Sequence, residues 1–132
     1  SMSTLNVSNI TDGTTTVGTS YVVNGSAKAW CSFDQNTPEI LDSINTSSLT
    51  DSSAGHGVLN WTSAMSNRLY TAPSQSIYVS SATAYCVTLC DAETYQNRTV
   101  SKWYFRNAYS NSSSTNFFDP DMGQVTITGD LA

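Results

Sequence analysis

Apolar and polar residues alternate in many short stretches of this chain. Within Ser26–Asp34, the alternation places Ala29, Cys31 and Phe33 on one face and Trp30 on the other. A period of two is typical of a half-buried β-strand, so Phe33 and the small residues are expected to face a core. Trp30 is then expected on the outer face or in a contact between subunits. Other extended segments are expected at Thr4–Ile10, Thr14–Asn24, Ile40–Thr50, Val58–Thr62, Arg68–Ser80, Ala82–Cys90, Arg98–Asn107 and Gln124–Thr128.

Turn residues separate these segments. Asp12-Gly13 and Asn24-Gly25 are typical of tight hairpin turns, and Asp51–Gly57 and Ala108–Thr115 have the composition of loops. Ser63–Asn67 is the one segment for which a helical turn is predicted. Roughly seven to nine short antiparallel strands with turns every 8–12 residues predict an all-β fold. The expected architecture is a single β-sandwich domain over residues 1–132.

Composition and charge support the β prediction and exclude several classes of protein. Charged residues make up 11% of the chain, against about 25% in an ordinary soluble domain, and Ser, Thr and Asn replace them. Strong helix formers are correspondingly scarce. With a net charge of −5 and five scattered basic residues, the chain lacks the clustered cations that bind nucleic acid. No apolar run approaches the ~20 residues that span a bilayer, so neither a nucleic-acid partner nor membrane insertion is predicted.

The three cysteines leave two interpretations open. If Cys86–Cys90 is a strand, its ends lie about 13 Å apart, which is too far for a disulfide between them. A bond from Cys31 to either of the others stays open. The alternative is three unpaired thiols in a chain made in a reducing cytosol. A zinc site would need several Cys and His at short spacing, whereas the only histidine, His56, is isolated in a predicted loop.

No catalytic motif is present in the sequence. A Gly-x-Ser-x-Gly elbow and an HExxH helix are both missing, so neither an enzyme nor a cofactor is predicted. A secreted lectin is one alternative, because seven N-x-S/T sequons occur. About three or four would arise by chance in a chain so rich in Ser and Thr, however, and Asn60 lies inside a predicted strand, where a glycan is awkward.

Several motifs in a fixed order resemble a known family. The chain carries YVVNGSAKAW at Tyr21–Trp30 and DSINTSSLTD at Asp42–Asp51, followed by VLNWT at Val58–Thr62 and an A-M-x-N element at Ala64–Asn67. It closes on VTITGDLA at Val125–Ala132. With this order and spacing, the sequence resembles the C-terminal domains of bacteriophage tail fibres, from residue 5 to residue 132. It departs from the family pattern between residues 68 and 124, and Cys31 stands where relatives often carry Val.

The resemblance implies a structural protein of the virion. Such a domain forms the distal part of a tail fibre, assembles as a homotrimer in the cytoplasm of the bacterial host and faces the cell surface of that host. Residues 3–20 are similar to the N-terminal segment that leads into the family's domain, and Ser1-Met2 is typical of a cleaved tag. No individual functional residue is carried over, because the family has no catalytic motif to match.

A receptor-binding domain of this kind is expected to hold a surface glycan on its loops. Aromatic planes stack on sugar rings, while carboxylates and amides bond the hydroxyl groups, and binding residues concentrate on loops. The alternative for each aromatic is a core or trimer contact, such as an intersubunit plug at Phe117-Phe118. Asp119-Pro120-Asp121 offers oxygens to Ca²⁺, although an ordinary Asx turn is favoured. A purely architectural fibre or capsid-surface domain is the alternative function. The candidate ligand-binding residues are Tyr95, Tyr109, Phe117, Phe118, Asp119 and Asp121.

Overall fold

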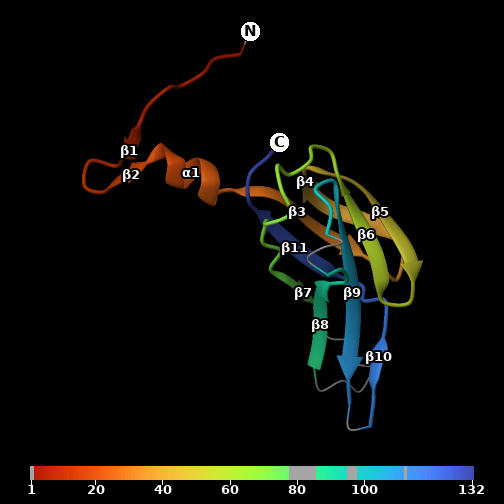
Figure 1. Cartoon of the computed structure of the whole chain (residues 1–132). Coiled ribbons are helices and arrows are strands. Elements are labelled where there is room, and N and C mark those ends of the chain that lie inside the picture. The colour runs from red at the N-terminus through yellow and green to blue at the C-terminus, as the bar shows by residue number, and fades with distance from the viewer. Residues whose placement is uncertain (1, 78–85, 95–97, 112) are drawn as a thin grey trace.

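The computed structural model describes residues 2–77, 86–94, 98–111 and 113–132. Within these residues the chain forms eleven strands and one short helix (Figure 1). The predicted all-β fold of antiparallel strands is confirmed. Four of the strands are only three residues long, so the strand number exceeds the predicted range. In chain order the elements are β1 Asn9–Thr11, β2 Thr16–Gly18, α1 Thr19–Gly25, β3 Ala27–Asp34, β4 Glu39–Ile44, β5 Thr46–Ser53, β6 His56–Trp61, β7 Ser74–Ser76, β8 Cys86–Asp91, β9 Lys102–Ser110, β10 Thr115–Phe117 and β11 Gly123–Thr128.

Two antiparallel sheets form the body of the molecule and pack together in a sandwich-like arrangement (Figure 1). The first has the strand order β4-β3-β11-β7. The second has the order β10-β9-β6-β5, with β8 also paired to β9. Strand β9 therefore has β8 along one edge and β6 followed by β10 along the other.

Aromatic rings fill the space between the sheets. The ring centroids of Phe33 and Phe105 are 4.8 Å apart, and those of Trp103 and Phe105 are 5.4 Å apart. Phe33 and Phe105 each lie over a glycine that is their register partner on the neighbouring strand. A Cβ atom on Gly123 would come within 2.6 Å of the Phe33 ring, and one on Gly57 within 2.4 Å of the Phe105 ring. Both glycines are therefore needed for close aromatic packing.

The period-two pattern assigned the core faces of the main strands. Burial alternates along β3, where Cys31 and Phe33 are buried and Trp30 is half-buried on the outside. The same alternation buries Leu59 and Trp61 on β6. The expected core face of β3 is therefore confirmed. Alternation also buries the following residues of β9 and β11: Trp103, Phe105, Val125 and Ile127.

A half-buried ion pair lies beside the core at the end of β8. Arg98 Nε lies 2.7 Å from Asp91 Oδ2, and the two side chains are only 17% and 27% exposed. The same carboxylate oxygen accepts a bond from Trp103 Nε1 at 3.2 Å. The guanidinium lies 4.0 Å from the centre of the Tyr70 ring and donates to the Tyr70 carbonyl. Burial raises the pKa of the Tyr70 phenol, and the charge of Arg98 partly opposes that rise.

Three local predictions are wrong. Residues 19–25 form helix α1 where an extended segment closed by a tight turn at Asn24-Gly25 was expected. The expected single strand Ile40–Thr50 is divided into β4 and β5 at Asn45, whose φ of 55° is left-handed. Asparagine tolerates this conformation, and its side chain bonds the backbone of Lys28 and Ser63. Residues 63–67 contain no helical turn, because buried Met65 instead bridges to Leu131.

Two predicted loops are shorter than expected. Strand β5 continues to Ser53 and β6 begins at His56, which leaves a tight turn where Asp51–Gly57 was expected to be a loop. Strand β9 continues to Ser110 and pairs with β10, so part of Ala108–Thr115 is also strand. In both places cross-strand pairing overrides a polar, turn-like composition.

The N-terminal part of the chain projects from the sandwich as an arm (Figure 1). We use the name arm for residues 2–26, which include β1, β2 and α1. Strands β1 and β2 form a small hairpin of their own, and no residue of α1 is buried. Among the described residues, no helix has the length and apolar character needed to cross a membrane.

Candidate functional site

Two of the predicted binding aromatics meet near one end of the sandwich. Tyr109 lies on β9 and Phe118 directly follows β10; their rings make an edge-to-face contact with centroids 5.4 Å apart. Phe117 lies on β10. The expectation that these side chains belong to loops is therefore wrong for Tyr109 and Phe117. Tyr95 lies outside the described residues.

Phe117 contacts a neighbouring histidine and arginine through its ring. Its ring is 49% exposed and meets the His56 ring edge-on at 4.7 Å, while the Arg106 guanidinium lies 5.4 Å from its centre. His56 Nδ1 lies 3.0 Å from the Ala54 carbonyl, and Arg106 Nε donates to His56 Nε2 at 3.1 Å. The prediction that His56 is a solvated loop residue is wrong, since it is half-buried at the start of β6.

Asp119 has a structural partner far away in sequence. Its Oδ1 accepts a bond from the backbone N–H of Gly55 at 2.7 Å, which fixes the turn between β5 and β6. Asp121 is exposed. Among the described residues, no three His, Cys, Asp or Glu side chains converge as a metal site would require. The carboxylate of Asp119 is thus committed to holding a turn.

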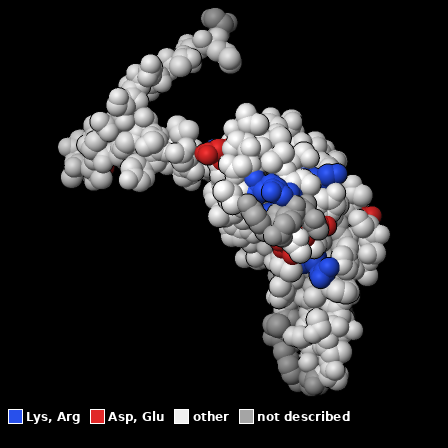
Figure 2. Space-filling view, viewed as in Figure 1, with Lys and Arg blue, Asp and Glu red and all other residues white. Residues whose placement is uncertain are grey.

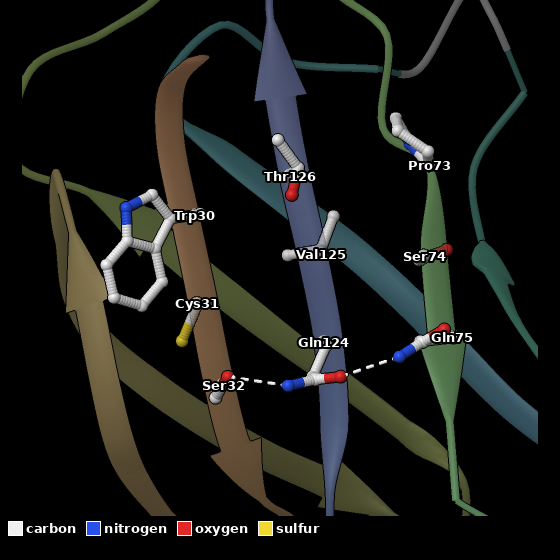
Figure 3. Close-up of a pocket in the computed structure, with 9 residues that line it drawn as sticks. All are labelled: Trp30, Cys31, Ser32, Pro73, Ser74, Gln75, Gln124, Val125 and Thr126. Atoms are coloured by element: carbon white, nitrogen blue, oxygen red, sulfur yellow. Dashed lines mark hydrogen bonds between the residues drawn. The ribbon is translucent and has the colours of Figure 1, made fainter.

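A second feature is a hollow on the outer face of the four-stranded sheet. It encloses about 410 Å³ and lies over β3, β11 and β7 (Figure 3). Trp30 and Ser32 come from β3, Gln124 and Thr126 from β11, and Gln75 from β7. We call this feature the outer hollow.

Three polar side chains form a hydrogen-bonded row in the outer hollow. Gln124 Nε2 donates to Ser32 Oγ at 3.1 Å, and Gln75 Nε2 donates to Gln124 Oε1 at 2.7 Å (Figure 3). We call Ser32, Gln124 and Gln75 the amide row. Each of the three sits at a facing position of adjacent strands. The row crosses β3, β11 and β7. The Trp30 ring lies nearest to its Ser32 end, on the side of β3 that faces away from Gln124 (Figure 3).

The amide row could not be assembled from the sequence. Its members are separated by 49 and 92 positions along the chain, and only the order β3-β11-β7 brings them together. One available signal was the outward position of Trp30 within an alternating strand. A large aromatic on a face directed away from the core is available to stack on a ligand or to contact a subunit.

A smaller hollow of about 270 Å³ lies on the outer face of the second sheet. Tyr104 and Arg106 of β9 line it together with His56 of β6 and Glu93. Tyr104 is also approached by the Lys102 ammonium, 5.5 Å from its ring centre. This hollow mixes acidic and basic groups and has no continuous row of amides.

Cys31 lies at the base of the outer hollow, and its thiol is unreactive. Its side chain is 1% exposed, and burial raises the pKa of its thiol to about 12. The thiolate is the nucleophilic form of cysteine, so Cys31 does not act as a nucleophile near neutral pH. Cys31 and Cys90 are both free, and a disulfide between them, one of the open alternatives, does not form. The side chain of Cys86 lies outside the described residues.

Among the described residues, we take the outer hollow and the aromatic cluster around Phe117 as the two candidate places for an external ligand. Each combines an aromatic ring with polar neighbours, and the smaller hollow shares His56 and Arg106 with the aromatic cluster. Comparison of this chain with protein-family models, with curated proteins and with solved structures finds no match.

Proposed function

We propose that this chain is the host-attachment domain at the distal end of a bacteriophage tail fibre and that it binds a glycan of the host-cell surface. The assignment to a fibre rests on the sequence motifs. Of those motifs, Tyr21–Trp30 covers most of α1 and the start of β3, and Asp42–Asp51 runs through parts of β4 and β5. A β-sandwich with open outer faces suits such a role, because its core is complete without the surface side chains.

The outer hollow is the single observation that supports glycan binding best. A sugar ring presents an apolar C–H face and a rim of hydroxyl groups, so it needs an aromatic plane beside paired donors and acceptors. Trp30 and the amide row supply this combination at one place on the sheet. We assign stacking to Trp30 and hydrogen bonding to Gln75 and Gln124.

The absence of a charged side chain in the outer hollow suggests the kind of glycan. None of the described residues that line it is Asp, Glu, Lys or Arg. An uncharged site gives no ion pair to a sialic or uronic acid, whereas amides bond neutral hydroxyl groups well. The proposed ligand is therefore a neutral hexose or N-acetylhexosamine unit.

The aromatic cluster around Phe117 is the second position to be tested. Tyr109, Phe117, Phe118, Asp119 and Asp121 remain predicted ligand residues, but several of them already contact partners within the chain. A carboxylate that holds a turn is poorly available to a ligand. For this reason we place the primary site at the outer hollow.

The test is binding of the purified chain to an array of neutral and acidic glycans and to host cells. Trp30→Ala should abolish binding while leaving the fold intact, because the Trp30 ring lies on the outer face. Tyr104→Ala is the matched control, since Tyr104 is a half-buried aromatic on the outer face of the opposite sheet. Phe117→Ala tests the aromatic cluster.

Each outcome distinguishes between the proposals. Loss of binding in Trp30→Ala alone supports the outer hollow, and loss in Phe117→Ala alone moves the site to the aromatic cluster. If the unmodified chain binds neither glycans nor cells, the attachment proposal is wrong and an architectural fibre domain is favoured.

A further inference from the structure

The outer face of the first sheet carries apolar side chains in a line beside the amide row. Ile44 of β4 is the register partner of Trp30, and Trp30 is the register partner of Thr126 on β11. The Thr126 N–H donates to the carbonyl of Pro73, so Pro73 lies next to Thr126 at the β7 side of the hollow (Figure 3). Ile44 is 53% exposed, and Pro73 is exposed as well. We call Ile44, Trp30 and Pro73 the apolar row.

Asp42 continues the line of the amide row onto β4. It is the register partner of Ser32, and residues that pair across antiparallel strands point to the same face. Asp42 is exposed. Its Oδ1 accepts a bond from the N–H of Ser43 at 2.9 Å, whereas its Oδ2 has no partner among the described residues. The carboxylate is therefore available to a ligand just beyond the β3 side of the outer hollow.

These two parallel lines are too long for one sugar ring. Asp42 and Gln75 lie on the outermost of four neighbouring strands, and strands are ~4.8 Å apart, so the line between them spans roughly 14 Å. A pyranose ring is about as wide as one strand spacing. The Trp30 ring lies on the side of β3 that faces β4, and Gln75 is two strands away in the other direction (Figure 3). A ring stacked on Trp30 therefore does not reach Gln75.

The part of this face over β4 and β3 can hold one sugar unit. Trp30 and Ile44 offer an apolar surface beside Asp42 and Ser32. Because Ser32 Oγ accepts a bond from Gln124, the hydroxyl hydrogen of Ser32 remains to be donated. A sugar hydroxyl can accept that hydrogen and donate its own to Asp42. We call this part the first subsite.

The part over β11 and β7 repeats the combination with different residues. Here Pro73 supplies the apolar surface beside Gln124 and Gln75. Each glutamine nitrogen uses one hydrogen within the amide row, and a side-chain amide nitrogen carries two. Each glutamine thus keeps one N–H for a ligand, and Gln75 Oε1 accepts no bond from the described residues. We call this part the second subsite.

The charges of the first sheet favour a neutral ligand in both subsites. Strands β7 and β11 have no charged residue, and the charged residues of β4 are the carboxylates Glu39 and Asp42. Lys28 on β3 already donates to two backbone carbonyls of the arm. Figure 2 shows Lys and Arg side chains on the sandwich, and two of these cations, Lys102 and Arg106, occupy outward positions of β9 in the other sheet. The charge of Asp42 therefore repels an acidic sugar from the first subsite.

We propose that the outer hollow and the adjoining β4 surface bind two consecutive units of a linear neutral glycan, which lies across the strands with one unit in each subsite. The C–H faces of the sugars rest on the apolar row, and their hydroxyl groups bond Asp42, Ser32 and the two glutamines. The inference rests on the proposed function and adds the length and the direction of the ligand.

Titration of the ¹⁵N-labelled chain with sugars of increasing length tests the proposal. The probes are neutral mono-, di- and trisaccharides of glucose, galactose, mannose and N-acetylglucosamine. A monosaccharide should shift the indole N–H signal of Trp30 and leave the side-chain amide signals of Gln75 unchanged, whereas a disaccharide should shift both. The disaccharide should bind at least about tenfold more tightly than its single unit, and a third unit should add less than the second.

Two variants separate the subsites. Gln75→Ala should weaken disaccharide binding about tenfold and leave monosaccharide binding unchanged. Asp42→Asn should weaken both, and it should reduce the discrimination against glucuronic acid because it removes the repelling charge. Asn60→Ala is the matched control for Gln75→Ala. Asn60 also donates to a side chain on the neighbouring strand, Ser48 Oγ at 3.0 Å, but lies on the opposite sheet.

The failure of this inference differs from the failure of the proposed function. If monosaccharides and disaccharides bind equally tightly, or if Gln75→Ala weakens both to the same degree, one ring fills the hollow and only the two-unit ligand is wrong. If the unmodified chain binds no glycan, both proposals are wrong. Circular dichroism checks the fold of each variant, which should be intact because Asp42 and Gln75 are exposed.

Discussion

Replacing Gly55 by alanine should strongly destabilise the sandwich. Gly55 occupies the tight turn between β5 and β6 with a φ of +75°. A Cβ atom built there would lie 2.3 Å from the backbone oxygen of Asn107. The Gly55 carbonyl accepts a bond from the Asn107 N–H at 2.6 Å, and the Gly55 N–H donates to Asp119. The turn thus cannot move away from Asn107 without straining both bonds.

The magnitude follows from two costs. A residue with a Cβ in the left-handed region costs about 1–2 kcal/mol. Relief of the clash with Asn107 requires weakening a buried backbone hydrogen bond, which costs about 1–2 kcal/mol more. We therefore expect Gly55→Ala to lower the free energy of unfolding by roughly 3 kcal/mol, a large part of the 5–15 kcal/mol that is typical of a whole domain.

Urea unfolding followed by tryptophan fluorescence measures this loss. Gly13→Ala is the matched control, because Gly13 also has a positive φ, +95°, but nothing lies within 4 Å of its Cβ position. It sits in the arm, so the unfolding of the sandwich should be unaffected. If Gly55→Ala costs less than about 1 kcal/mol, the turn is not constrained as the structure indicates and the reasoning fails.

Three further predictions concern the interior. Asp91→Asn should lower the free energy of unfolding in urea by about 1–3 kcal/mol, because Arg98 would keep its charge in a largely buried place without a counter-ion. In a chain with Cys86 replaced by serine, Ellman's reagent at pH 8 should modify exposed Cys90 at once and Cys31 only on unfolding. Raising the pH above 9 should lower the free energy of unfolding. The pKa of the Cys31 thiol is about 12 in the folded chain and 9.0 for an ordinary thiol, so the unfolded chain loses this proton at a lower pH than the folded chain does. The loss approaches about 1.4 kcal/mol per pH unit between those values, and Cys31→Ala should remove that part of the pH dependence.

The inward faces of the core strands were predictable, because burial of every second side chain produces their alternation of apolar and polar residues. On β3 every second side chain must enter the core, so the positions of Cys31 and Phe33 could be read from alternation. Helix α1 was missed for the opposite reason. Tyr21, Val22 and Val23 favour strands intrinsically, and α1 has neither a cap nor a buried stripe that would have revealed it.

The candidate site was only partly predictable, because its residues lie on strands that are adjacent in the sheet but distant in the sequence. Alternation placed Trp30 on the outside of a strand but could not say which strands would flank it. Gln75 belongs to β7, a strand of three residues inside the longer segment Arg68–Ser80 that was expected to be extended. The sequence could not show that Gln75 pairs with Gln124 of β11. The sequence-based choice of loop residues followed composition, whereas pairing of β9 with β10 turned two of those residues into strand positions.

The same alternation that builds the core also separates stability from function. Because inward positions of β3 are filled by Cys31 and Phe33, the outward positions of Trp30 and Ser32 are free to vary without opening a cavity. The outer hollow can therefore change its specificity while the sandwich stays intact. A chain in which Trp30→Ala abolished glycan binding and left the free energy of unfolding unchanged would demonstrate this separation directly.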